Sequence, residues 1–360
     1  MTQKDIRIGI VGAHSTASWA KASHIPAIQS LRGARLAAVA TRNEQSAREA
    51  AKAFGADRWY SDPYAMIRDP RVDLVTVAVN VHAHRDLVLA ALEAGKAVYC
   101  EAPLARSVAE TRELARAARS NHTAIGLQGR HNPTVRRAAE LVSSGRIGRP
   151  LNARIVAQTL AHGPEMPIQY DYCNKFASGA NHLTIVGGHT LDLVEAVLAP
   201  ISEVDARTET RWPKVKLTET GGESAREVPD WVGVVGRTRS GAVFTADIEA
   251  GVQPEKVRFS FEVRGSEGWL TLTSTHPYGV QAGDLTLTSN VAFAPPEKAV
   301  VPGGVGGAAI NVGELYAHLV RDMHAGTHTT PGFDHALHNA RLIEAVSRAA
   351  ERGERQHLID

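Results

Sequence analysis

The chain has 360 residues, which is long enough for two domains that each bury a core. Its 40 Lys and Arg residues against 38 Asp and Glu residues leave a net charge of +2, which argues against a nucleic-acid or membrane partner. Two cysteines are too few for a disulfide framework, and no apolar run reaches membrane-spanning length. With no apolar signal segment at the start, we expect a cytoplasmic protein.

The first third of the chain alternates short strand-like runs with helical patterns. A helix is expected at 44–54, ending at Gly55, and strands at 6–11, 36–40, 74–79, 97–100 and 124–127. This alternation predicts an α/β fold with a doubly wound parallel Rossmann sheet, whose ligand lies at the carboxyl ends of the strands. We assign residues 1–127 to this dinucleotide-binding domain.

From Leu151 onward, strand-like segments follow one another with turn signals between them. Strands are expected at 231–237, 243–250 and 257–263, and helices at 312–325 and 334–352. We therefore expect residues 128–360 to form a C-terminal α+β domain with a large, mostly antiparallel open sheet.

A six-residue turn, Gly-Ala-His-Ser-Thr-Ala at 12–17, follows the first strand in the place of the G-x-G-x-x-G/A nucleotide fingerprint. Glycines belong there because the backbone must turn tightly and approach a pyrophosphate. The first glycine and the final small residue are kept, whereas a histidine replaces the second glycine. A plain strand-to-helix turn explains this weak motif equally well. If the turn binds phosphate, the residues involved are Gly12, His14, Ser15 and Thr16.

Thr41 and Arg42 follow the second strand. Dinucleotide folds place an acid there to bind the ribose 2′-hydroxyl, or an Arg to accommodate a 2′-phosphate. A guanidinium offers a planar fork of donors to phosphate oxygens. We therefore expect NADP as the cofactor, with NAD as the alternative. Arg42 can also be interpreted as a solvated charge at the start of the next helix.

A glycine-containing helical segment that ends at Asp192 holds the densest group of chemically useful side chains. Gly187 and Gly188 each cost about 1 kcal/mol relative to Ala in a helix, so a ligand or another backbone is expected to approach closely. His189 and Asp192 share one helix face. An imidazole with a pKa near about 6.5 can accept a proton from a substrate hydroxyl, and a nearby carboxylate raises its basicity. His182 is interpreted as a satisfied core residue.

Three further residues are candidates for contacting a substrate. Arg130 follows the last strand of the first domain, where its guanidinium can hold two hydroxyls or a carboxylate. An interdomain salt bridge is the alternative interpretation. Lys175 and Tyr172 lie in an irregular loop before the glycine segment. His82 and His84 alternate with no cluster of Cys or carboxylate residues nearby, so no metal site is expected.

The run Tyr-Cys-Glu-Ala-Pro-Leu at 99–104 ends a strand with an acid and a proline. It resembles the Glu-Lys-Pro signature of the Gfo/Idh/MocA family (glucose-fructose oxidoreductase, inositol dehydrogenase and rhizopine catabolism), whose Lys reaches the substrate hydroxyl beside the nicotinamide. Here Ala102 stands at the Lys position. The family's second signature places an Asp four residues before the catalytic His, and Ile185 replaces that Asp. His189 and the following Asp192 remain.

This resemblance covers the whole chain and looks closest to the branch of the fungal galactose-regulon repressor. The shared segments include Trp-Ala-Lys at 19–21, His-Ile-Pro-Ala-Ile at 24–28 and Val-Pro-Asp at 228–230. The resemblance implies a substrate-binding second domain, with homodimers or homotetramers formed through its sheet. It also implies that the cofactor's neighbours include Asn80, His84, Glu101 and Ala102.

Two functional hypotheses follow. In the first, the chain is an NAD(P)-dependent oxidoreductase that acts on a sugar, cyclitol or related polyhydroxylated ligand, with His189 as the acid/base group. In the second, it is a catalytically inert regulatory protein that binds dinucleotide or sugar. The retained His189 and Asp192 favour the enzyme, whereas Ala102 and Ile185 favour the binder.

Overall fold

The computed structural model describes residues 4–16, 18–118, 120–302 and 305–358. The chain divides into two compact units. The first unit contains Met1–Gln128 and Ala299–Leu337, and the second contains Gly129–Lys298 and His338–Asp360.

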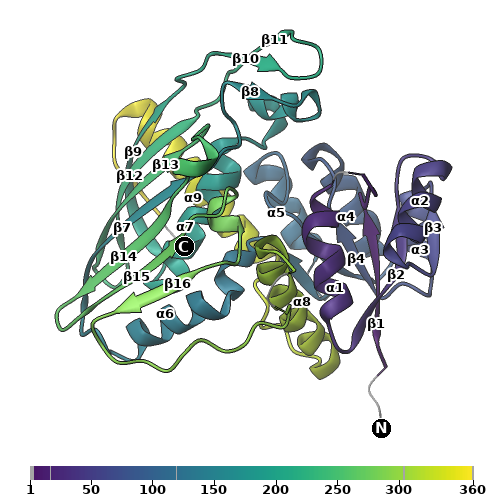
Figure 1. Cartoon of the computed structure of the whole chain (residues 1–360), viewed down its shortest axis with the longest axis horizontal. Helices are drawn as coiled ribbons and strands as arrows, with labels where there is room; N and C mark the ends of the chain where they lie inside the picture. The colour runs from purple at the N-terminus through teal and green to yellow at the C-terminus, as the bar shows by residue number, and fades with distance from the viewer. Residues whose placement is uncertain (1–3, 17, 119, 303–304, 359–360) are drawn as a thin grey trace. The chain divides into compact units, whose positions relative to one another are not determined.

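The described part of the first unit forms a six-stranded parallel sheet in the order β3-β2-β1-β4-β5-β6. Strands β1 to β4 of this sheet are labelled in Figure 1. Its strands are β1 (Ile6–Val11), β2 (Ala34–Ala40), β3 (Arg58–Tyr60), β4 (Leu74–Val77), β5 (Ala97–Cys100) and β6 (Thr123–Ile125). The helices of this unit are α1 (Ile25–Ser30), α2 (Glu44–Phe54), α3 (Pro63–Arg68), α4 (His84–Glu93), α5 (Val108–Ala117) and α8 (Gly307–Ala325).

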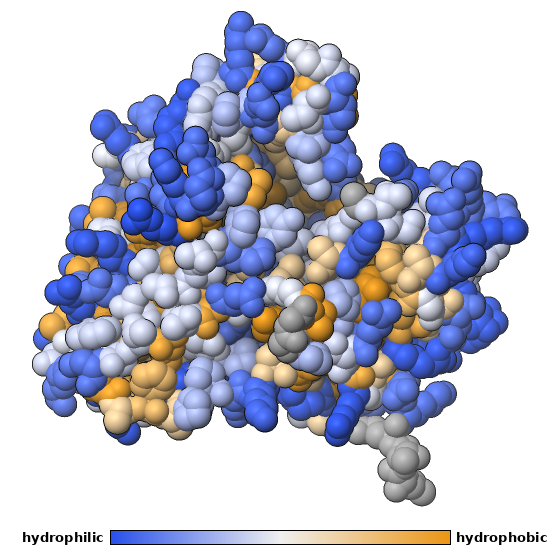
Figure 2. All heavy atoms as spheres, in the orientation of Figure 1, coloured by the Kyte–Doolittle hydropathy of each residue, from blue (hydrophilic) through white to orange (hydrophobic). Residues whose placement is uncertain are grey.

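Apolar clusters cover both faces of this sheet. Ile8 and Ile10 of β1 belong to one cluster and Val11 belongs to the other, because successive side chains of a strand point to opposite faces. On the outer side, α2 presents charged residues to solvent, and the region of α2 and α3 is largely hydrophilic in Figure 2. The predicted Rossmann fold is confirmed, with β1, β5 and α2 at the expected residues and Gly55 ending α2 at φ 72°.

Helix α8 belongs to the first unit, although the sequence analysis placed it with the second domain. It packs against α1 and against the π-helical turn Ala20–His24. Its side chains Val312, Leu315 and Tyr316 join the cluster that contains Ile8 and Ile10 of β1. An amphipathic pattern shows that a helix has an apolar face, but it does not show which sheet that face covers.

The described part of the second unit contains an eight-stranded, mostly antiparallel sheet in the order β16-β15-β14-β7-β13-β12-β9-β17, and the one parallel pair in it is β7 with β13. Its strands are β7 (Pro150–Gln158), β9 (Ile201–Glu209), β12 (Trp231–Thr238), β13 (Val243–Glu249), β14 (Phe259–Gly265), β15 (Trp269–Ser274), β16 (Thr286–Ser289) and β17 (Gln356–His357). A smaller sheet combines β8 (Glu165–Met166), β10 (Lys214–Leu217) and β11 (Glu223–Ala225).

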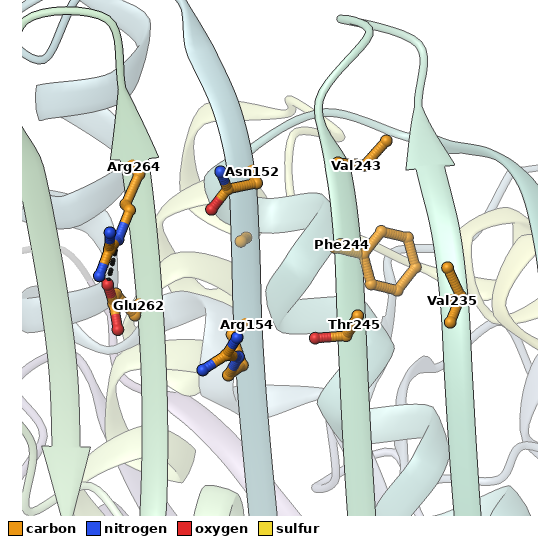
Figure 3. Close-up of a pocket in the computed structure, with 9 residues that line it drawn as sticks. Asn152, Arg154, Val235, Val243, Phe244, Thr245, Glu262 and Arg264 are labelled. Atoms are coloured by element: carbon orange, nitrogen blue, oxygen red, sulfur yellow. Dashed lines mark hydrogen bonds and ion pairs between the residues drawn. The ribbon is translucent and has the colours of Figure 1, made fainter.

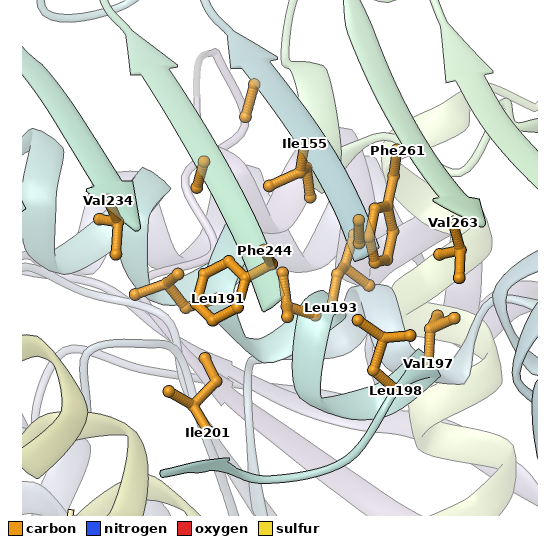
Figure 4. Close-up of a cluster of buried hydrophobic side chains, with 14 of the residues drawn as sticks. Ile155, Leu191, Leu193, Val197, Leu198, Ile201, Val234, Phe244, Phe261 and Val263 are labelled. Atoms are coloured by element: carbon orange, nitrogen blue, oxygen red, sulfur yellow. The ribbon is translucent and has the colours of Figure 1, made fainter. Parts of the chain in front are cut away.

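The core of the second unit lies between one face of the large sheet and its helices. The helices that contribute are α6 (Pro133–Ser143), α7 (Gly188–Val197) and the part of α9 (Phe333–Arg352) that follows Leu337. Leu191 and Leu193 of α7 meet Phe244 and Phe261 of the sheet in this core (Figure 4). Within the described residues, no helix is both long and apolar enough to cross a membrane.

Candidate functional site

Four of the predicted cofactor-binding segments follow neighbouring strands of the parallel sheet. Gly12 follows β1, Thr41 follows β2, Asn80 follows β4 and Glu101 follows β5. Because all these strands run in one direction, their carboxyl ends lie along one edge of the sheet. The strand order reverses between β1 and β4, the place where doubly wound sheets bind their ligands.

The backbone at Gly12 accepts no other residue. Its φ is +99°, and a Cβ added there would lie 2.4 Å from the carbonyl oxygen of Ala78 and 2.8 Å from Cγ1 of Val79. This close approach of the β1 turn to the end of β4 fits the tight first turn of a dinucleotide site. Ala17, the last position of the predicted fingerprint, lies outside the described residues.

The polar side chains of the turn contact one another. Nδ1 of His14 lies 2.9 Å from Oγ1 of Thr16, and the backbone N–H of Thr16 donates to the same nitrogen at 3.4 Å. The imidazole is therefore held against the turn. A glycine at this position would leave the backbone accessible to a phosphate.

At the end of β2, the hydroxyl of Thr41 is held within the loop, 2.7 Å from Oγ of Ser46 and 3.3 Å from the carbonyl oxygen of Asn43. Asn43 caps α2 by accepting the N–H of Ser46. Arg42 is exposed beside these contacts. The loop therefore offers a guanidinium, and not the hydroxyl, to a ligand at this strand end.

His84 is buried and joins the strand-end loops. Its Nε2 lies 3.0 Å from the carbonyl oxygen of Val79, and its Nδ1 lies 3.1 Å from that of Pro103 and 3.3 Å from Sγ of Cys100. Burial lowers the pKa of this imidazole. Asn80 accepts the N–H of His82 at 3.2 Å and starts the short helical turn before α4.

A buried chain of polar groups, which the sequence analysis missed, supports Glu101. Nε2 of His24 lies 3.1 Å from Oε1 of Glu101, and Nδ1 of His24 lies 2.8 Å from the hydroxyl of Tyr316. That hydroxyl lies 2.7 Å from Oγ1 of Thr76. His24, Tyr316 and Thr76 are fully buried. The shared segment at 24–28 was the available sequence signal, but the separation of 77 positions from His24 to Glu101 concealed the pairing.

Ala102 is half-buried and packs against the apolar cluster that contains Val77 and Cys100. Its methyl side chain has no polar atom that could transfer a proton or bind a hydroxyl. Ile185 packs against the core of the second unit.

In the second unit, His189 and Asp192 lie on α7, which continues directly from the π-helical turn Leu183–Gly187. Their exposed fractions are 2% and 1%. π-Helical turns occur frequently at functional sites. Side chains approach both glycines closely: a Cβ on Gly188 would lie 3.1 Å from Oδ1 of Asn339, and one on Gly187 would lie 3.1 Å from Cδ1 of Leu183.

Arg130 and Asp192 form an ion pair, with 3.4 Å between Nε and Oδ2. The two residues belong to the same unit, so this is not the interdomain salt bridge considered from the sequence. Asp192 is almost fully buried, and Arg130 is 17% exposed at its side chain. The structure therefore brings together Arg130 and the acid that follows His189.

Lys175 and Tyr172 are anchored to the small sheet. Nζ of Lys175 donates to the carbonyl oxygen of Ala225 at 2.9 Å and lies 3.2 Å from Oε1 of Glu227. Tyr172 packs against the small apolar cluster of Met166, Cys173 and Val215, and burial raises its pKa. These contacts show how the loop before the π-helical turn is held.

His182 is buried, as predicted, with Nε2 3.4 Å from the carbonyl oxygen of Ile248. Its ring centroid lies 5.6 Å from that of His162, whose φ of 58° is unusual for a residue other than glycine. Burial lowers the pKa of His182 to about 4 and that of His162 to about 3. Among the described residues, no group of three His, Cys, Asp or Glu side chains is arranged to hold a metal ion.

Known proteins resemble this chain in sequence. It is 29% identical over 245 residues to levoglucosan dehydrogenase of Pseudarthrobacter phenanthrenivorans, covering 64% of this chain and 63% of that protein. It is 26% identical over 289 residues to the galactose/lactose metabolism regulatory protein GAL80 of Saccharomyces cerevisiae, covering 74% of this chain and 66% of that protein. The chain thus spans less than two thirds of the length of either relative.

Solved structures share the fold over nearly the whole length. The super-repressor mutant of Gal80p from Saccharomyces cerevisiae superposes with a TM-score of 0.84 at 23% identity, covering 98% of both chains. Levoglucosan dehydrogenase in complex with NADH and L-sorbose gives a TM-score of 0.83 at 22% identity, covering 99% of both chains. At these identities the likeness establishes the fold.

Family matches cover both parts of the chain. Residues 6–128 match the oxidoreductase family with an NAD-binding Rossmann fold, and residues 133–274 match the Gal80p C-terminal domain. By these matches, residues 6–128 belong to the Gfo/Idh/MocA oxidoreductase family with an NAD-binding Rossmann fold, and residues 133–274 form a C-terminal domain of the Gal80p type.

Proposed function

We propose that this protein is an NAD(P)-dependent oxidoreductase that transfers a hydride between a nicotinamide and a sugar, cyclitol or related polyhydroxylated ligand. The observation that carries the dinucleotide part is Gly12, where a Cβ would meet the carbonyl oxygen of Ala78 at 2.4 Å. This is the close approach that the first glycine of a dinucleotide fingerprint provides. Relatives named as dehydrogenases support the oxidoreductase part.

The chain's own chemical task is to bind the ligand and to hold one proton. A bound nicotinamide supplies the hydride acceptor when the ligand is oxidised. We assign the proton of the reacting hydroxyl to the imidazole of His189, because neither Ala102 nor Ile185 can hold it. Arg130 neutralises Asp192 at 3.4 Å, so the buried acid is stabilised beside the helix face of His189.

We propose NADP as the preferred cofactor. Arg42 is exposed at the end of β2, and the neighbouring Thr41 hydroxyl is already engaged by Ser46. A guanidinium in this place suits a 2′-phosphate. Family membership itself supports NAD-type binding without deciding between the two cofactors.

We also propose that the large sheet joins two or more copies of the chain. Its face away from α6 and α7 carries a cavity of about 370 Å³, and Val235 and Val243 there are 55% and 40% exposed (Figure 3). Arg264 and Glu262 form an ion pair on the same face. Light scattering on wild type and Val235→Glu tests this: the variant should have a lower mass, and an equal mass would contradict the proposal.

A second candidate function is an inert regulatory protein that binds dinucleotide or sugar. Ala102 and Ile185 favour it, because neither side chain can take part in proton transfer at the family's signature positions. The match of residues 133–274 to the Gal80p C-terminal domain supports the same candidate.

One experiment addresses both candidates. The purified protein is denatured and any released ligand is identified by mass, and NADP⁺ and NAD⁺ reduction is then measured against aldoses, ketoses and inositols.

Gly12→Ala should abolish dinucleotide binding. Gly95→Ala is the matched control, because Gly95 also has a positive φ, of 69°, but no atom lies within 4 Å of the added Cβ. Equal dinucleotide affinity in both variants would contradict the assigned site.

A further inference from the structure

Lys21 lies beside the nucleotide turn and has no part in the function proposed above. It belongs to the π-helical turn Ala20–His24, and its Nζ donates to the carbonyl oxygen of Thr16 at 3.2 Å. The side chain is exposed, and within the described ranges no acidic residue forms an ion pair with it. An ammonium group has three N–H donors, so two remain for another acceptor.

The turn next to Lys21 has lost the feature that usually accommodates a pyrophosphate. A second glycine lets the backbone approach the phosphates closely. Here His14 occupies that position, and its ring is held over the turn by the 2.9 Å contact with Thr16. The negative charge of a pyrophosphate must then be met by side chains. A Lys is suited to this because it acts as a point charge toward phosphate.

We propose that Lys21 is the cation that binds the pyrophosphate of the dinucleotide, in place of the close backbone approach that His14 prevents. This inference rests on the proposed dinucleotide-binding function. NAD(H) and NADP(H) carry the same pyrophosphate, so Lys21 contributes equally to both. Arg42, by contrast, acts on the 2′-phosphate alone.

Fluorescence titrations of the full-length protein with NADH and NADPH test the proposal. Lys21→Met removes the charge and keeps most of the aliphatic stem, and it should raise the Kd for both cofactors by about tenfold or more. Lys21→Arg should stay within about threefold of wild type, because it keeps the charge. Lys52→Ala is the control, since Lys52 is an exposed Lys at the far end of α2 in the same unit. Its affinities should not change.

Competition with ADP and with adenosine shows which part of the dinucleotide Lys21 contacts. Lys21→Met should weaken ADP binding and leave adenosine binding unchanged, because only ADP carries a pyrophosphate group. Thermal unfolding midpoints equal to that of wild type show that the variants are folded.

Three outcomes would overturn the inference, and they are distinguishable. If Lys21→Met binds NADH within about twofold of wild type, Lys21 does not contact the pyrophosphate, while the proposed dinucleotide binding still holds. A loss confined to NADPH assigns Lys21 to the 2′-phosphate. A wild type that binds neither cofactor rejects both the proposed function and this inference.

Discussion

Nε of Arg130 lies 3.4 Å from Oδ2 of Asp192, so the buried acid on the helix of His189 is paired with a cation from a different segment. The sequence pattern assigned Asp192 to raising the basicity of His189. The ion pair gives it a further task, because a buried carboxylate is costly unless it is paired. Arg130 is thus tied to the candidate catalytic helix through its charge.

Replacing Arg130 with Gln should lower the free energy of unfolding by about 3 kcal/mol, because the Asp192 carboxylate stays buried without its cation. Arg130→Lys keeps the charge and should cost less. Urea denaturation of the two variants provides the measurement. A midpoint for Arg130→Gln equal to that of wild type would show that the pair contributes nothing to stability.

Arg42→Ala should remove most of the preference for NADPH over NADH. A charge-assisted contact typically contributes about 1.5 to 3 kcal/mol. The variant loses this contact only with NADPH, because only NADPH carries the 2′-phosphate. Titrating both reduced cofactors by fluorescence gives the preference directly. Wild type that binds NADH as tightly as NADPH would reject the assignment of Arg42.

His189→Ala should abolish turnover and leave dinucleotide affinity nearly unchanged. General acid/base groups contribute about 10²- to 10⁴-fold to the rate, whereas the phosphates are assigned to the other unit. Steady-state rates and fluorescence titration separate the two effects. Activity that survives within a few-fold would assign the proton to another group, with Lys175 and Tyr172 as the next candidates.

Asp322→Asn should destabilise the protein in a pH-dependent way. Burial raises the pKa of the Asp322 carboxyl, but hydrogen bonds from Thr327, Thr330 and Thr329 outweigh it and hold the pKa well below its ordinary value of 3.8. A carboxyl whose pKa is lower in the folded than in the unfolded protein stabilises the folded protein at pH values above its unfolded-state pKa. This contribution is lost as the pH falls through the folded-state pKa.

The loss in Asp322→Asn should therefore be about 2 to 3 kcal/mol at about pH 7 and should shrink below about pH 4. Urea midpoints of the variant and of wild type across this range test the sign. A difference that grows toward acid pH would contradict it.

Local patterns in the sequence predicted much of the fold. The apolar runs at β1 and β5 and the capped helix α2 matched the structure residue for residue, because strand alternation and capping are local. The short strand β3 and helix α3 carry too few residues for a periodic signal and were not predicted. The packing of α8 on the first unit depends on contacts between distant parts of the chain, which periodicity does not report.

The candidate site was predicted as separate motifs but not as contacts. The carboxyl ends of β1, β2, β4 and β5 were expected to carry the cofactor residues, and the parallel sheet places these segments along one edge. The pairings of His24 with Glu101 and of Arg130 with Asp192 join residues 77 and 62 positions apart. Neither separation follows from a helix or strand repeat, so only the folded structure reveals these two pairings. The glycines of the α7 segment pointed to close approach, which comes from side chains of α9 and of the preceding turn.

We propose that the protein is catalytically active with Ala102 and Ile185 at the positions where the family resemblance predicts Lys and Asp. The test is the formation of NADPH by wild type and by the double variant Ala102→Lys/Ile185→Asp, measured across aldoses, ketoses and inositols. We predict turnover by wild type and slower turnover by the double variant, because the new ammonium enters half-buried space beside an apolar cluster, where it must be paired or lose its proton. A wild type without turnover beside an active double variant would contradict the enzyme assignment.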